Sequence, residues 1–173
     1  MSADPNLWQR LDMTARNLMP SGLTLFLAIA SVAPTRIPGF VGISPMLALM
    51  GIYYWSMTRP DLLRASVAFG IGLFVDILTG TPLGVHVLVF LLTHGLLVRQ
   101  NRFFNNKPFH VLWLAFGVVA AGAGLLKWGL VAFLQTGAVD PHVFFFGYIM
   151  TVAVYPLAGW MFARLQLVVL KEE

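Results

Sequence analysis

Four ionisable side chains lie inside apolar stretches of this 173-residue chain: Asp76, His86, His94 and Lys127. A carboxylate, an ammonium group and two imidazoles could transfer protons, hold an ion or pair with one another. Hydrolysis and phosphoryl transfer usually need paired carboxylates, an activated nucleophile or a glycine-rich phosphate loop. None of these patterns occurs in the sequence. We therefore expect no catalytic site and no enzyme.

Asp76 is the most informative of the four. Gly72 and Gly80 lie four residues to either side of it, which places all three on one narrow helix face that another backbone can approach. An ionised carboxylate is costly in an apolar environment, so it should face protein or trapped water. Two interpretations stay open. Asp76 is either an interior anchor or part of a functional polar cavity, or a hydrogen-bonded carboxyl with a purely structural role.

Lys127 also lies on a stripe of small residues. Gly117, Ala120 and Gly124 precede it at spacings of three and four. Leaving either charge alone in an apolar region is unfavourable, so the sequence suggests an intramembrane ion pair between Asp76 and Lys127. The alternative is that the Lys127 side chain extends outward to the lipid headgroups.

The two histidines lie eight residues apart, close to the same face of a helix. Metal-binding histidines are more often three or four residues apart, with carboxylate or thiolate ligands nearby. The chain offers no such cluster and contains no cysteine. We expect no metal and no cofactor, and we expect His86 and His94 to be neutral and hydrogen-bonded between helices.

The elements that position these groups are apolar segments. Apolar residues make up 58% of the chain and charged residues 10%, whereas a soluble domain carries about 25% charged residues. We therefore predict an all-α polytopic membrane protein, because helices satisfy their backbone polar groups internally in lipid. Polar, Gly and Pro breaks delimit about six transmembrane helices at 18–33, 43–57, 62–79, 83–98, 109–135 and 142–169.

The basic residues predict the orientation of these segments. Nine of the eleven lie in the two ends and in every second connection, which together lie on one side of the membrane. Arg36 lies in a connection on the opposite side, and Lys127 is inside a segment. By the positive-inside rule, both termini are cytoplasmic. The basic residues form no continuous stripe, so no nucleic-acid partner is expected. The nine are Arg10, Arg16, Arg59, Arg64, Arg99, Arg102, Lys107, Arg164 and Lys171.

The chain divides into a cytoplasmic arm (1–17), a single six-helix membrane domain (18–170) and a cytoplasmic tail (171–173). The basic arm followed by an apolar run imitates a cleavable signal peptide, but the run reads equally well as a retained first span. Between the third and fourth segments, 80–84 reads as a tight turn in which Pro82 opens the next helix.

One stretch of the chain resembles the bacterial rod shape-determining protein MreD family. That family carries Arg-Pro after its second span and a glycine-rich signature with one Asp through the third span into the next turn. Residues 59–60 and 69–84 follow this order, and length and segment number agree over essentially the whole chain. The matching positions, a partner-binding or bundle-core motif, are Arg59, Pro60, Gly72, Asp76, Gly80 and Gly84.

The resemblance implies a non-catalytic scaffold of the cell-elongation machinery that builds peptidoglycan at the bacterial inner membrane. Its partners would be MreC and, in the wider complex, MreB, RodA and a transpeptidase, with a homodimer as a further option. The resemblance also implies the fold of the substrate-binding subunits of energy-coupling-factor transporters. The glycine faces around 72–80 and 117–124 are candidate docking surfaces, unless packing inside the bundle fills them.

Two other functions stay open. One is a small-molecule-binding subunit of an energy-coupling-factor type transporter, with a cavity near Asp76 and Lys127. Short outer connections poor in polar groups count against it. The other is a protein that binds a lipid or a lipid-linked precursor, a role that needs no motif.

Overall fold

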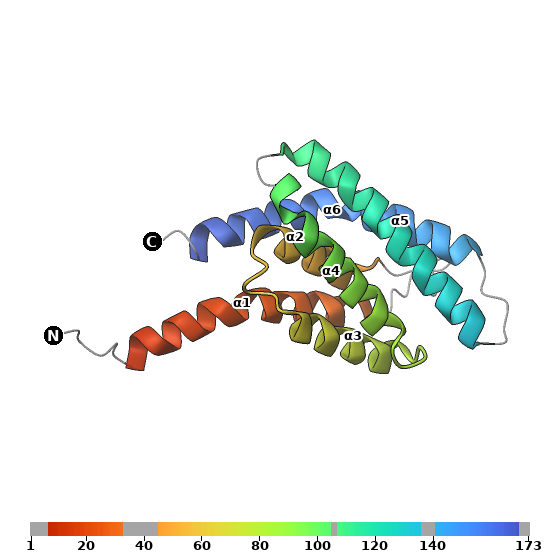
Figure 1. The fold of residues 1–173 in the computed structure, drawn as a ribbon, viewed down its shortest axis with the longest axis horizontal. Helices are drawn as coiled ribbons and strands as arrows, with labels where there is room; N and C mark the ends of the chain where they lie inside the picture. The colour runs from red at the N-terminus through yellow and green to blue at the C-terminus, as the bar shows by residue number, and fades with distance from the viewer. Residues whose placement is uncertain (1–6, 33–44, 105–106, 136–140, 170–173) are drawn as a thin grey trace.

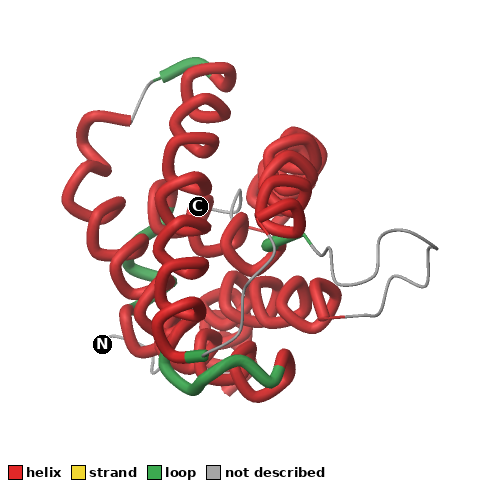
Figure 2. The backbone as a smooth tube through the Cα atoms, turned by 90° about the vertical axis from the view of Figure 1, so that its right-hand side faces the viewer, coloured by secondary structure: helices red, strands yellow, loops and turns green. Residues whose placement is uncertain are grey.

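The computed structural model describes residues 7–32, 45–104, 107–135 and 141–169. These residues form six α-helices and no strand, which confirms the all-α prediction (Figure 2). The ends 1–6 and 170–173, which include the predicted tail, lie outside the described residues, as does Arg36. The helices are α1 (Leu7–Val32), α2 (Leu47–Thr58), α3 (Ala65–Thr79), α4 (Val85–Phe104), α5 (Phe109–Leu134) and α6 (Pro141–Val169).

Two helices extend further than the apolar segments that predicted them. α1 begins at Leu7 rather than at residue 18, and α4 continues to Phe104 rather than ending at 98. The predicted apolar segments end where charged side chains begin. Arg and Gln are good helix formers, however, so the helical backbone continues past them. The predicted arm 1–17 is therefore partly helical.

The helices run back and forth along the molecule (Figure 1). The α2–α3 connection and the adjoining ends of α4 and α5 lie toward the end where α1 starts and α6 finishes. The α3–α4 turn, the end of α5 and the start of α6 lie toward the opposite end. Five of the six basic side chains that the structure describes belong to elements at the first end, namely Arg59, Arg64, Arg99, Lys107 and Arg164.

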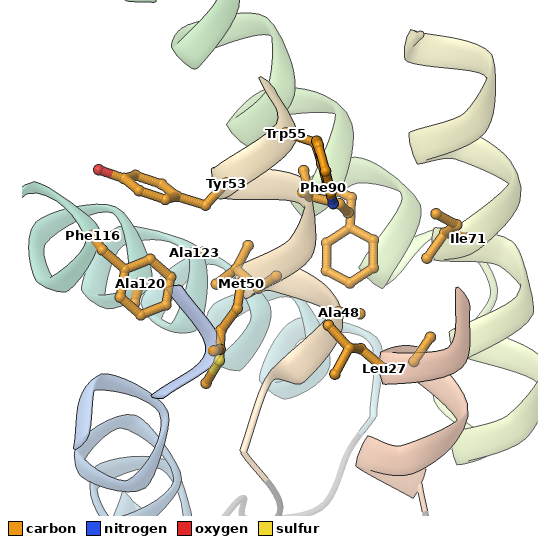
Figure 3. Close-up of a cluster of buried hydrophobic side chains, with 14 of the residues drawn as sticks. Leu27, Ala48, Met50, Tyr53, Trp55, Ile71, Phe90, Phe116, Ala120 and Ala123 are labelled. Carbon is orange, nitrogen blue, oxygen red and sulfur yellow. The ribbon is translucent and has the colours of Figure 1, made fainter. Parts of the chain in front are cut away.

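The short helix α2 forms the centre of the bundle. It packs against α1, α4 and α6, and the side chains of Leu49, Ile52, Tyr53 and Trp55 are almost completely buried. Helices that are apolar all round are expected in such interior positions. At about 18 Å, α2 is shorter than the hydrocarbon core of a bilayer. Figure 3 shows its side chains in one buried cluster with Leu27, Ile71, Phe90 and Phe116 from the surrounding helices.

Hydrogen bonds link α2 to its neighbours. The Tyr53 hydroxyl donates to the carbonyl of Leu112 in α5 at 2.9 Å. The Tyr54 hydroxyl donates to Gln166 Oε1 in α6 at 2.8 Å. Such bonds between helices add stability where water cannot compete.

The outer surface of the bundle is strongly apolar. Exposed side chains include Phe133, Val118, Leu157 and Leu114, each with about two thirds or more of its surface accessible. A surface this apolar is typical of a protein surrounded by lipid. Two helices of the described chain are long and apolar enough to cross a membrane, namely Phe109–Leu134 and Pro141–Gln166.

Candidate functional site

The buried carboxylate of Asp76 lies in the last turn of α3, with none of its surface exposed. Its Oδ1 accepts the backbone N–H of His86 at 3.0 Å and the hydroxyl of Thr81 at 2.9 Å. Its Oδ2 accepts the backbone N–H of Gly84 at 2.9 Å. Asp76 therefore joins the end of α3 to the start of α4.

The His86 ring completes this network. Its Nδ1 lies 2.8 Å from Asp76 Oδ1 and 3.2 Å from the Thr81 hydroxyl oxygen. An ionised carboxylate can only accept, so in that state the Nδ1 atom of His86 carries the proton. Both carboxylate oxygens are thus engaged by donors of the α3–α4 turn. That arrangement satisfies a buried charge and does not aim a free base at a substrate.

Two glycines give the turn its shape. Gly80 follows the end of α3 with φ of 65°, and Gly84 precedes α4 with φ of 102°. Residues with a side chain are strained in this left-handed region, whereas glycine adopts it freely. Gly84 rather than Pro82 stands before the first residue of α4, so the predicted role of Pro82 as the opening residue of the helix is corrected. The carbonyl of Pro82 accepts the N–H of Val85 within the turn.

Gly72 allows α3 and α4 to touch. A Cβ atom built on Gly72 would lie 2.6 Å from Val87 Cα and 2.8 Å from its backbone nitrogen. Only a residue without a side chain fits this close approach. Gly80 was expected on the same close-packed face, but a Cβ there would meet nothing within 4 Å. α3 ends at Thr79, so Gly80 acts through its backbone conformation instead.

The predicted ion pair between Asp76 and Lys127 is not formed among the described residues. The side-chain contact that Asp76 makes with α4 is the hydrogen bond from Nδ1 of His86 at 2.8 Å. Lys127 in α5 interacts with Asp76 only through longer-range electrostatics. The partly exposed Lys127 side chain lines a cavity between α5 and α6 that Thr81 also borders.

Comparison with family models now identifies the chain. Residues 12–168 match the model of the rod shape-determining protein MreD. The chain belongs to the MreD family. MreD is a membrane family with a role in rod shape determination, in agreement with the apolar surface of the bundle. No curated protein and no solved structure matches the chain, so the expected likeness to energy-coupling-factor subunits stays a prediction.

The positions that suggested the MreD resemblance do not converge on one site. Gly72, Asp76, Gly80 and Gly84 meet at the α3–α4 turn. Arg59 and Pro60 belong to the connection at the other end of α3, about 20 Å away along that 15-residue helix. There the Arg59 N–H donates to the carbonyl of Trp55 and ends α2.

The small-residue stripe of α5 is filled by α6 in this MreD-family protein. The ring of Phe144 fills the space where a Gly124 side chain would lie, and the Tyr148 hydroxyl donates to the Gly117 carbonyl at 3.3 Å. α5 and α6 thus pack closely along this stripe. Neither glycine presents an open face to a partner.

Thr81 and Ser56 complete polar contacts that the sequence did not reveal. Thr81 joins Asp76 to His86, and Ser56 Oγ in α2 lies 2.8 Å from His94 Nδ1 in α4. The predicted hydrogen bonding of both histidines between helices is therefore confirmed. The serine at position 56 in an apolar run was the available signal, but periodicity does not say which helix it faces.

Proposed function

We propose that the protein is a non-catalytic scaffold of the rod-elongation machinery at the bacterial inner membrane, where it binds MreC. The observation that carries this proposal is that donors of the protein itself bind the buried carboxylate of Asp76. Asp76 is engaged entirely in holding α3 against α4 and is not directed at a substrate. A site of this kind maintains the shape of a helical surface, and such a surface is what a membrane scaffold offers its partners.

We infer six membrane passes with both termini in the cytoplasm. Five of the six described basic side chains, those of Arg59, Arg64, Arg99, Lys107 and Arg164, belong to the end of the bundle where α1 starts and α6 finishes. Excess Lys and Arg on one side favours the cytoplasm for that side. The α3–α4 turn then faces the periplasm.

The groove between α4 and α5 is our candidate surface for the single transmembrane helix of MreC. It has a volume of about 260 Å³ and no charged lining residue. Gly122 and Ala123 are among its lining residues, and a Cβ on Gly122 would meet nothing within 4 Å. Helices associate in membranes where small residues let their backbones approach. This groove is open to a partner, whereas Gly72 and Gly124 are covered inside the bundle.

The groove also exposes large apolar side chains along its rims. Leu92 and Leu96 of α4 and Val118 of α5 are each about half exposed or more. A docked helix would cover these side chains and replace lipid contacts with fitted protein contacts. Through MreC, the scaffold would be connected to MreB filaments, RodA and a transpeptidase.

Substitution of Gly122 by Leu tests the proposal. The leucine fills the groove, and overpacking of about 1–3 kcal/mol corresponds to binding weaker by a factor of about 5 to 150. We expect Gly122→Leu to lower co-purification of MreC by about that factor and to impair rod shape, while the protein still inserts. The matched control is Gly70→Leu, because Gly70 is equally open on the exposed side of α3.

Equal MreC recovery from the wild type, Gly122→Leu and Gly70→Leu would refute the groove as the docking surface. Loss of MreC from Gly70→Leu alone would move the interface to α3. A differently tagged second copy, recovered in place of MreC, would indicate that the groove serves a homodimer. Failure of the wild type to recover MreC at all would refute the scaffold proposal.

A further inference from the structure

A second cavity lies between α5 and α6, on the side of α5 where Lys127 projects. Its volume is about 190 Å³, and its walls are mainly apolar, with Ala120, Gly124, Val131 and Val143 among them. The Lys127 side chain brings a single basic group into this apolar space. An ammonium group in such surroundings is costly unless an anion accompanies it.

Asp76 is the described acidic residue that acts on Lys127, but its side chain makes no contact with the Lys127 ammonium group. Asp76 acts on Lys127 electrostatically, but its oxygens accept from Thr81, Gly84 and His86. Among the described residues, Lys127 has no hydrogen bond or ionic contact of its own. The ammonium group can therefore donate to a ligand without breaking a bond within the described protein.

The hydroxyl groups on the cavity wall already donate elsewhere. Thr151 donates to the Gly147 carbonyl at 2.6 Å, and Tyr148 donates to the Gly117 carbonyl at 3.3 Å. Thr81 donates to Asp76. None of these three protons faces a ligand, so the attraction for a ligand comes from one cation and from apolar contact. That combination fits a molecule with one negative group attached to a hydrocarbon chain.

We infer that this cavity binds an anionic phospholipid, with the phosphate at Lys127 and the start of an acyl chain beside Ala120 and the ring of Phe144. The volume supports a lipid over a complete small-molecule ligand, whose pockets measure about 300–1,000 Å³. A phosphate group and the first methylenes fit inside, and the remaining chain lies on the apolar exterior. Lys127 is about 10 Å from the end of α5, and Trp128 beside it suits the membrane interface.

Native mass spectrometry of the full-length protein in detergent tests this site. The probes are phosphatidylglycerol, phosphatidylcholine with the same acyl chains, and inorganic phosphate. A charge-assisted hydrogen bond corresponds to a factor of about ten in affinity. We expect the wild type and Lys127→Arg to retain phosphatidylglycerol about tenfold better than Lys127→Met. The matched control Lys107→Met, which removes an exposed lysine before α5, should behave as the wild type.

A second variant separates ligand binding from folding. Val131→Phe reduces the cavity volume without changing any charge, so it should also lower phosphatidylglycerol retention. Equal retention by the wild type, Lys127→Met and Val131→Phe would overturn the inference. So would equal retention of phosphatidylcholine, which would leave no role for the charge.

Two further outcomes would replace the lipid with another ligand. Displacement of phosphatidylglycerol by inorganic phosphate would show a site for a free anion. Loss of MreC from Lys127→Met with unchanged lipid retention would show that the cavity receives an acidic side chain of a partner. Because these measurements do not involve Gly122, failure of the lipid inference and failure of the scaffold proposal are distinguishable.

Discussion

The carboxylate of Asp76 in α3 lies 3.0 Å from the backbone nitrogen of His86 in the first turn of α4. The first N–H groups of a helix have no partner within the helix and are usually bound by a side chain just before it. Here the acceptor comes from the preceding helix, ten residues earlier in the chain. One side chain therefore caps α4 and fixes the angle between two helices.

Removal of this cap should unfold the turn. Asp76→Ala leaves four buried or partly buried donors without this acceptor, namely the Thr81 hydroxyl, the backbone N–H groups of Gly84 and His86, and the His86 ring N–H; each group left unsatisfied costs about 1–3 kcal/mol. We expect a loss of at least about 3 kcal/mol, seen as a lower thermal unfolding midpoint in detergent. Asp76→Asn should fall between the wild type and Asp76→Ala, because the amide keeps one accepting oxygen.

Asp61→Ala is the control for this change. Asp61 is an exposed carboxylate before the opposite end of α3, so its removal should change stability by less than about 0.5 kcal/mol. If both alanine variants unfold at the same temperature, Asp76 is not the cap described above. If Asp76→Ala keeps its stability and loses MreC, the carboxylate acts at a partner interface.

Gly72→Ala should weaken the contact between α3 and α4. The added methyl group would lie 2.6 Å from Val87 Cα, so the helices must separate, at a cost of about 1–3 kcal/mol. Gly70→Ala, two residues earlier on the open side of the same helix, should be neutral or stabilise by up to about 1 kcal/mol. Thermal unfolding of the two variants side by side measures the difference. A stabilising Gly72→Ala would contradict the close helix crossing.

Ser56 and His94 should stabilise the packing of α2 against α4 as a pair. Their side chains lie 2.8 Å apart in the buried interior. Hydrogen bonds between membrane helices measure about 0.6 kcal/mol on average and up to about 1.7. A double-mutant cycle with Ser56→Ala and His94→Ala should give a coupling energy in this range. Strictly additive effects of the two changes would mean that the bond contributes no stability.

Single-cysteine labelling can test the proposed topology directly, since the native sequence contains no cysteine. Leu83 on the α3–α4 turn and Asp61 before α3 are both exposed, at opposite ends of α3. A membrane-impermeant maleimide added to intact spheroplasts should label Leu83→Cys, and Asp61→Cys only after permeabilisation. The reverse pattern would show that the bundle has the opposite orientation in the membrane. Labelling of both cysteine variants in intact spheroplasts would rule out a membrane crossing by α3.

Both changes avoid the charges that determine orientation. Neither removes a Lys or Arg, and Asp contributes little to the orientation of membrane segments. The labelling pattern therefore reports the native topology.

The sequence alone determined the class of the protein and the number of helices in the part of the chain that the structure describes. A chain with so few charged groups cannot cover a soluble surface, and in lipid its backbone must bond internally, so apolar runs become helices. The four-residue spacing of Gly72 and Asp76 also placed both on one helix face. These conclusions depend only on composition and on helical periodicity.

Only the tertiary structure decided what those residues contact. Asp76 meets His86 and not Lys127, because positive φ angles at Gly80 and Gly84 fold the turn back over the carboxylate. Gly124 is covered by Phe144, while Gly122, two residues earlier, remains open. Periodicity assigns a residue to a face of its own helix, but the neighbour on that face depends on how helices distant in sequence cross and on the backbone angles of the turns between them.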